Sequence, residues 1–259
     1  MESDPEVSIV IPAFNEEKLL PRALESITEA IVHTRFMTEL IIVDNASSDA
    51  TPKIAEQFGA KVILEERKGV GYARQAGLDA SLGKIILTSD ADGTQVPHEW
   101  IEAHRHHYEN PKVVSVSGKY IFYDQVHPLM NVYTAGSKIW HQTLRTAIHY
   151  VRGLDPHKHS SKFAGSNMSY RRDAAIGVGG YREGVNVSED TDLGYRLEDI
   201  GMVIRDESLE ITIRTSARRF QNAEDVLQNL AFRLSRFFER YVRGVERPLI
   251  NEGTMKDIR

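Results

Sequence analysis

The chain has 259 residues, which suits one large α/β domain or two small ones and is enough to bury a sizeable core. Its formal net charge of -5 gives no support to a nucleic-acid partner, because such proteins usually show strong net basicity, and the lack of cysteine excludes disulfides and thiolate metal sites. No stretch approaches the roughly 18 apolar residues that a membrane span needs, and the acidic start does not resemble a signal peptide, so we expect a cytoplasmic protein.

The first half of the chain alternates short apolar runs with longer amphipathic ones. Buried strands are expected at residues 7–11, 40–43, 62–64 and 85–88. Helical spacing of apolar residues predicts a helix over 19–27. Further helices are expected through 54–58, over the small residues of 70–80, and from Pro97 through 108. This alternation predicts βαβ units in a parallel sheet, and the continuously apolar strands indicate that both sheet faces are covered.

Polar residues and one proline mark the expected boundaries of these elements. Pro12 is expected to end the first strand, and Asn15 to cap the helix that follows. Ser48 and Asp49 are candidate caps for the next helix, and Gly59 lies just past its end.

The second half of the chain is less regular. Strands are expected within residues 113–123, 163–170 and 203–213, and helices over 129–151, 190–200 and roughly 223–245. Residues 153–162 are polar and rich in histidine. Because the spacing of this group fits no zinc site, a flexible acceptor loop is expected there instead, with His149, His157 and His159.

Acidic residues follow two of the expected strands. Asp44 comes directly after the second strand, and Asp90 and Asp92 come after the fourth in Thr-Ser-Asp-Ala-Asp-Gly. In an open parallel sheet, ligands bind beyond the carboxyl ends of the strands. Paired oxygen ligands suit Mg²⁺ or Mn²⁺ held against a diphosphate, whereas the same letters also suit an ordinary turn.

A second acidic cluster, Glu189, Asp190 and Asp192, precedes a predicted helix. Ser188 or an aspartate can cap this helix, and acids in its first turn complement the helix dipole. A carboxylate there can equally serve as a general base. Upstream, the glycine-rich residues 68–74 follow a strand and open a helix. The third glycine of a dinucleotide fingerprint would fall at Arg74, which is too large for that contact, so no nicotinamide site is expected.

Taken in order, several segments resemble family 2 glycosyltransferases of the GT-A fold, over roughly residues 7–215. They are residues 8–17, 41–49 and 69–77, Asp90-Ala91-Asp92, residues 165–168, and Glu189-Asp190. The resemblance implies an α/β fold with a Rossmann-like, mostly parallel central sheet flanked by helices and a smaller acceptor-side region. It also favours the metal interpretation of the Asp-x-Asp over the turn.

The resemblance implies a donor site for a nucleotide-diphospho-sugar. Asp44 would bind the nucleoside, in a pocket also lined by Pro12, Ala13 and Glu16. Asp92 would be the main protein ligand of Mg²⁺ or Mn²⁺, with Asp90 near the ribose and the metal.

The family's late acidic pair implies the catalytic group. Asp190 would be the general base that takes the proton of an acceptor hydroxyl, and Glu189 would support it. Arg74 would contact the nucleotide diphosphate or brace Asp90, with a solvated helix arginine as the alternative. The reaction implied is an inverting, metal-assisted direct displacement, in which the metal neutralises charge on the leaving diphosphate.

The sequence departs from the family pattern in three places. Asn45 stands where a second Asp is common, and Gln75 where Asn is frequent. The Gln-x-x-Arg-Trp of processive members is absent, which favours transfer of single sugars. Near that position, Arg218 and Arg219 either close over the diphosphate or are simply solvated.

We expect residues 1–220 to form the glycosyltransferase domain, with a nucleotide-sugar half over about 1–110 and an acceptor half over about 111–220. Residues 221–259 would add an amphipathic helix and tail. That helix either packs on the core or lies on an anionic membrane. In the second case the acceptor would be a lipid-linked molecule in the membrane; otherwise a plain sugar acceptor is equally open.

Two other function classes remain open at this point. A nucleotidyltransferase shares the broad architecture, but the glycine-rich loop expected after its first strand is missing from residues 12–17. A non-catalytic nucleotide-sugar binding module would be expected to lose the base or the Asp-x-Asp, and this chain keeps both.

Overall fold

The computed structural model describes residues 4–129, 163, 165–185, 188–224, 226–227 and 231, without the side chain of Arg219. The first half contains β1 Val7–Ala13, α1 Leu20–His33, β2 Thr38–Asp44, α2 Thr51–Gln57, β3 Lys61–Leu64, α3 Val70–Ala80, β4 Ile85–Thr88, α4 Trp100–His106 and η1 His107–Glu109. The second half contains β5 Val113–Ser117, β6 Tyr120–Phe122, β7 Met168–Arg171, α6 Arg172–Gly177, α7 Glu189–Glu198, β8 Met202–Arg205, β9 Ile213–Thr215 and η2 Arg218–Phe220.

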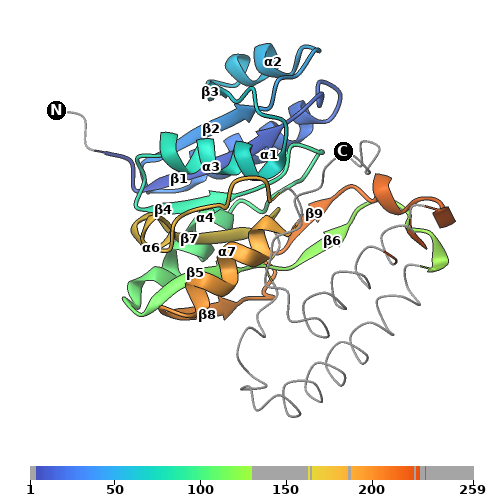
Figure 1. The fold of residues 1–259 in the computed structure, drawn as a ribbon. Coiled ribbons are helices and arrows are strands. Elements are labelled where there is room, and N and C mark those ends of the chain that lie inside the picture. The colour runs from blue at the N-terminus through green and yellow to red at the C-terminus, as the bar shows by residue number, and fades with distance from the viewer. Residues whose placement is uncertain are drawn as a thin grey trace.

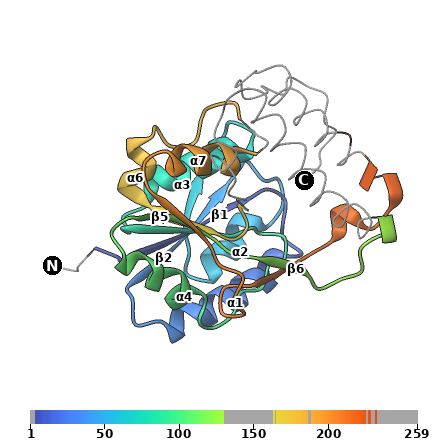
Figure 2. The same cartoon turned by 90° about the horizontal axis from the view of Figure 1, so that it is seen from below.

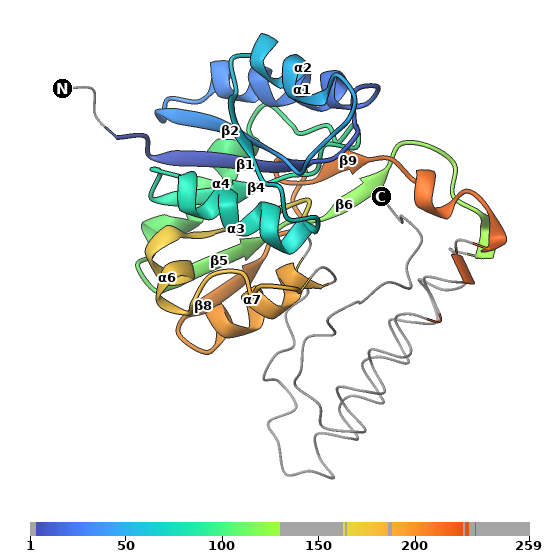
Figure 3. The same ribbon diagram turned by 45° about the horizontal axis from the view of Figure 1, so that its top comes forward.

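The central sheet has seven strands in the order β3-β2-β1-β4-β7-β5-β8 (Figure 1). The first four in this order run parallel to their neighbours, β7 is antiparallel to β4 and β5, and β8 is again parallel to β5. The expected mostly parallel sheet is therefore confirmed. The strands β6 and β9 form a separate parallel pair that extends away from this sheet (Figure 3).

Helices cover both faces of the sheet, with α1 and α4 on one side and α3, α6 and α7 on the other (Figure 2). Alternate residues of β1 serve the two layers: Ile9 and Ile11 join the core under α1 and α4, and Val10 joins the core under α3 and α7. Gly77 of α3 lies so close to Val10 that an added Cβ would meet its Cγ1 at 2.2 Å. The continuous apolar pattern of the strands follows from this burial on both faces.

The prediction that Pro12 ends the first strand is wrong, since β1 runs on to Ala13. The backbone groups of even-numbered residues in β1 face β4; for example, the Val10 carbonyl accepts the amide of Ser89. The pairing of β1 with β4 stops at Val10. The missing N–H of Pro12 therefore falls where no partner strand needs it.

The expected helix cap at Asn15 is also wrong. The helix α1 begins at Leu20, and Asn15 instead adopts a left-handed φ of 52° in the loop before it. The helix α2 has no side-chain cap at Ala50, although the Asp49 carboxylate accepts the amide of Thr51 at 3.0 Å. Gly59 does follow α2, with a φ of 74°.

The structure adds α6, which the sequence pattern did not indicate, and β7 occupies only the last part of the strand expected over 163–170. The helices expected over 129–151 and 223–245 lie almost wholly outside the described residues, as does the histidine-rich loop. In the described part of the chain, no helix is long and apolar enough to cross a membrane.

A buried polar network ties α4 to β7. His104 is fully buried, with Nδ1 2.8 Å from the Ser169 hydroxyl and Nε2 3.1 Å from the Asn167 side-chain oxygen. That oxygen also accepts the Trp100 indole N–H at 2.9 Å, and the Asn167 amide donates to the carbonyls of Lys119 and Ile211. Asn167 therefore holds the main sheet to the segments that enter β6 and β9.

Acidification is expected to destabilise the protein through His104. Burial lowers the pKa of His104 to about 4, although its hydrogen bond to Asn167 opposes this. The unfolded chain takes up this proton below about pH 6.5 and the folded chain only below about pH 4. The free energy of unfolding should therefore fall by about 2 kcal/mol between pH 7 and pH 5 from this group. Urea unfolding of His104→Gln should show a flatter pH dependence than the wild type, and equal slopes would contradict this.

Candidate active site

The loops after β1 and β2 are joined side by side at the carboxyl edge of the sheet. The amide of Asn15 donates to the Ser47 hydroxyl at 2.9 Å, and the Asn15 side-chain oxygen accepts the amide of Ser48 at 2.8 Å. The Glu17 amide donates to Asp49 at 3.2 Å. These bonds explain why Asn15 caps no helix, and they hold the two loops together.

Asp44 ends β2 opposite Ala13, and its carboxylate accepts the amide of Ser47 at 3.2 Å. The next residue, Asn45, is buried, and its side-chain amide donates to the carbonyls of Glu65 and Arg67 at 2.9 and 2.8 Å. Its side-chain oxygen accepts the amide of Gly69 at 2.8 Å. An ionised carboxylate has no hydrogen to donate and could make neither contact, so this position requires the amide of Asn in place of Asp.

Replacing Asn45 by Asp should lower the free energy of unfolding by about 3 kcal/mol, because the buried Glu65 carbonyl and the partly buried Arg67 carbonyl lose their donor and face a negative charge. Chemical denaturation measures this. The matched control is Asn110→Asp, since Asn110 is exposed and its side-chain oxygen accepts the amide of Lys112, a contact that a carboxylate can also make. Similar losses in the two variants would contradict the assigned role of Asn45.

The Asp-x-Asp segment follows β4 and turns at Gly93, whose φ is 78°. Asp92 is buried, and its Oδ1 accepts the hydroxyls of Thr94 at 3.1 Å and Thr215 at 3.2 Å. Thr215 ends β9, so the second sheet is anchored on this segment. Asp90 is more open, with 37% of its side chain exposed.

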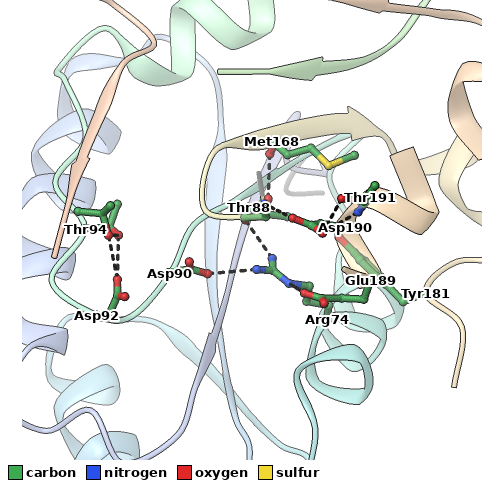
Figure 4. A network of polar contacts seen from close by, with 12 residues as sticks. Arg74, Thr88, Asp90, Asp92, Thr94, Met168, Tyr181, Glu189, Asp190 and Thr191 are labelled. Atoms are coloured by element: carbon green, nitrogen blue, oxygen red, sulfur yellow. Dashed lines mark hydrogen bonds and ion pairs between the residues drawn. The ribbon is translucent and has the colours of Figure 1, made fainter. Parts of the chain in front are cut away.

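Arg74 of α3 lies between the Asp-x-Asp segment and α7 (Figure 4). Its Nε donates to Glu189, one terminal nitrogen to the Gly165 carbonyl and the other to Asp90, each at 3.1 Å. Only 4% of the side chain is exposed, so the interpretation as a solvated arginine is wrong. Burial acts to lower the pKa of Arg74, but Asp90 and the other acids around it raise that pKa above its ordinary value.

The acid pair opens α7, where both carboxylates lie at the positive end of the helix dipole. Glu189 is buried; burial first, and then the charge of Asp190, raises the pKa of Glu189, while Arg74 opposes the shift. Asp190 accepts the Gly165 amide on one oxygen at 2.7 Å and the Thr191 amide on the other at 2.6 Å. Ser188 makes no side-chain cap, so Ser188 does not cap this helix as its position suggested.

A second ion pair joins distant parts of the chain. Arg218 of η2 donates to the Glu16 carboxylate with both terminal nitrogens, one of them at 3.0 Å. Burial opposes the charge of Arg218, but the bond to Glu16 raises the pKa of the guanidinium. The Arg218 side chain is 31% exposed and Glu16 is nearly buried, so the solvated alternative does not hold for Arg218.

The predicted site residues thus fall into local groups at one edge of the sheet. Asp90, Arg74, Glu189 and Asp190 form one linked cluster, while Asp92 is held by threonines and Glu16 by Arg218. Gly165, which lies in one of the segments that carry the resemblance, also joins the site, as does Thr215, which the sequence did not single out. Among the described residues, no three His, Asp or Glu side chains converge as a ready metal cage. The oxygen donors of Asp90 and Asp92 still fit Mg²⁺ or Mn²⁺, since Mg²⁺ commonly takes one or two carboxylates with substrate phosphates.

The family model described as glycosyl transferase family 2 matches residues 8–178. The chain belongs to this family. The predicted family and its enzyme class, glycosyltransferase, are thereby confirmed.

Curated family 2 relatives match only part of this chain. An uncharacterized glycosyltransferase of Mycobacterium tuberculosis is 38% identical over 88 residues, covering 34% of this chain and 37% of its own length. The undecaprenyl-phosphate 4-deoxy-4-formamido-L-arabinose transferase of Pseudomonas fluorescens is 35% identical over 100 residues, covering 36% and 29%. The matched part therefore spans about a third of these relatives.

Solved glycosyltransferases share the fold over most of the chain. A mannosyltransferase from Pyrobaculum calidifontis, in complex with GDP-Man and Mn²⁺, has a TM-score of 0.58 at 19% identity, covering 90% of this chain and 65% of its own. Glucosyl-3-phosphoglycerate synthase from Mycobacterium tuberculosis, in complex with Mn²⁺ and UDP-Glc, has a TM-score of 0.58 at 18% identity, covering 92% and 79%. These likenesses confirm the predicted GT-A fold.

Proposed function

We propose that this family 2 chain transfers a single sugar from a nucleotide-diphospho-sugar to an acceptor hydroxyl by metal-assisted direct displacement with inversion. The observation that carries the proposal is the Arg74 cluster, which joins Asp90 of the Asp-x-Asp to the acid pair of α7 at the carboxyl edge of the sheet. The Asp-x-Asp segment, which suits a metal and a diphosphate, and the acid pair, which suits removal of a proton, therefore lie in the same cluster.

The nucleotide-sugar half, about residues 1–110, holds the donor. Asp44 contacts the nucleoside in the pocket formed with Pro12, Ala13 and Glu16. Arg218 contacts the diphosphate, because its fork already binds the Glu16 carboxylate, and phosphate oxygens accept the same two N–H groups. Donor binding then exchanges Glu16 for phosphate at this guanidinium.

Asp92 and Asp90 hold the metal, for which the bound Mn²⁺ in the two solved glycosyltransferases gives support. When bound, Mg²⁺ or Mn²⁺ supplies positive charge to the leaving diphosphate. Because the chain offers only these two carboxylates to the metal, the donor phosphates can fill its remaining ligand positions.

Asp190 acts as the general base toward the acceptor hydroxyl. Two amides fix its carboxylate, and α7 brings it to the site from the acceptor half, about residues 111–220. A base supplied from the acceptor side suits attack on the face opposite the diphosphate, which inverts the anomeric carbon. The anomeric configuration of the product tests this point.

The acceptor is a sugar or a lipid-linked molecule. The lipid-linked class gains support from the Pseudomonas fluorescens relative, which is named as an undecaprenyl-phosphate 4-deoxy-4-formamido-L-arabinose transferase. Contact of residues 221–259 with a membrane surface, which would serve such an acceptor, stays a prediction, because those residues lie almost wholly outside the described part.

Calorimetric titration with UDP, GDP and dTDP, each with and without Mn²⁺, tests the donor site. We expect one nucleotide to bind tightly and only with the metal. Binding of none of the three by the folded protein would contradict the proposal.

A further inference from the structure

Arg74 occupies the centre of the cluster and contacts three separate parts of the chain. All its guanidinium nitrogens are used. Two of them donate to Asp90, which lies after β4, and to Glu189, which opens α7 (Figure 4). The third donates to the carbonyl of Gly165, which lies before β7. A lysine could not replace these contacts, because its single ammonium lacks the planar fork that reaches three acceptors.

Gly165 links Arg74 to Asp190. Its carbonyl accepts from Arg74 at 3.1 Å, and its amide donates to Asp190 Oδ2 at 2.7 Å. A Cβ added at this glycine would lie 2.5 Å from one Arg74 nitrogen, 2.9 Å from Cζ and 3.3 Å from Asp190 Oδ2. Only glycine therefore lets the main chain contact both side chains at once.

The orientation of the Asp190 carboxylate depends on this arrangement. The Thr191 amide, which holds Oδ1, belongs to the same helix and would hold it in any event. The Gly165 amide, which holds Oδ2, belongs to a segment that Arg74 ties down. Displacement of Arg74 therefore frees one oxygen of Asp190 and leaves the other bound.

We propose that Arg74 and Gly165 are positioning residues, which transmit the state of Asp90 in the donor site to the carboxylate of Asp190. The inference rests on the proposed function. Asp90 Oδ1, which accepts from Arg74 here, would also be the oxygen available to a metal, and loss of that bond would leave Arg74 held by Gly165 and Glu189. The base is thereby oriented when the donor is present.

Arg74→Lys tests the inference, with Arg196→Lys as the matched control. Arg196 of α7 also uses all its nitrogens, two toward Asp192 and one toward the Val178 carbonyl, and its side chain is 16% exposed. Release of nucleoside diphosphate from the donor gives kcat and the donor KM, and thermal unfolding gives stability. Gly165→Ala perturbs the same path without removing a charge.

We expect Arg74→Lys and Gly165→Ala to lower kcat about 100-fold with the donor KM within about 3-fold, the scale expected for a misplaced catalytic group. Arg196→Lys should lose comparable thermal stability and keep kcat. Unchanged kcat in Arg74→Lys would overturn the inference, and so would a loss confined to KM, which would make Arg74 a donor ligand. A wild type that binds nucleotide yet releases no diphosphate would refute the proposed function itself, and the inference with it.

Discussion

Replacing Asp92 by asparagine should remove metal-dependent nucleotide binding. The amide keeps an oxygen for the Thr94 and Thr215 hydroxyls, so the anchoring of β9 survives, but the negative charge offered to the metal is lost. With only one or two carboxylates to hold Mg²⁺ or Mn²⁺, loss of the main one should weaken nucleotide affinity in Mn²⁺ by about 100-fold, toward the metal-free value. Calorimetry measures this, and chelation of the metal from the wild type should give the same affinity.

Two further variants complete that test. Asp92→Ala should give the same loss, and Asp79→Ala, an exposed position on α3 whose carboxylate accepts only from Gln75, should bind like the wild type. Unaltered Mn²⁺-dependent affinity in Asp92→Asn would mean that the metal is held elsewhere.

Replacing Asp190 by asparagine should stop transfer and spare donor binding. A general base contributes roughly 100- to 10,000-fold, and an amide cannot take the acceptor proton, so we expect kcat to fall about 1,000-fold. Donor affinity should stay within a few-fold, since Asp190 contacts Gly165 and Thr191 and not the Asp-x-Asp segment. The measurement is initial-rate kinetics alongside nucleotide titration.

The control for that variant lies on the same helix. Asp192 pairs with Arg182 and Arg196, and Asp192→Asn should lose stability without a matching loss of kcat. If Asp190→Asn keeps more than about a tenth of the wild-type rate, the base is another group, and Glu189 is the next candidate.

The sequence predicted α3 and β4 with their observed bounds, because both are regular βαβ elements whose apolar spacing reflects burial directly. The prediction that Pro12 ends the first strand was wrong. The pairing of β1 with β4 stops at Val10, so the missing N–H of Pro12 interrupts no hydrogen bond, and the sequence does not show where that pairing stops. The prediction at Asn15 was wrong for a similar reason, because the loop partner of that side chain is 33 residues away at Ser48.

The candidate site shows the same division. The order of the acidic segments pointed to Asp90, Asp92 and the acid pair, which lie at one edge of the sheet. The burial of Arg74 could not be foreseen, because its partner Glu189 is 115 positions along the chain, and the pair of Glu16 with Arg218 spans 202. Asn45 stood out in the sequence only as a departure from the family pattern, and its side-chain hydrogen bonds to Glu65, Arg67 and Gly69 give a structural reason for the amide.

Sugar transfer from a nucleotide-diphospho-sugar is tested most directly by identifying the products that the wild type and Asp190→Asn form from a panel of UDP-, GDP- and dTDP-sugars. We expect the wild type to release nucleoside diphosphate from one donor class, chelation of the metal to stop the reaction, and the variant to be nearly inactive. Pyrophosphate formed from a nucleoside triphosphate and a sugar phosphate would contradict sugar transfer in favour of a nucleotidyltransferase. Tight binding of a donor without any turnover would contradict it in favour of a binding module.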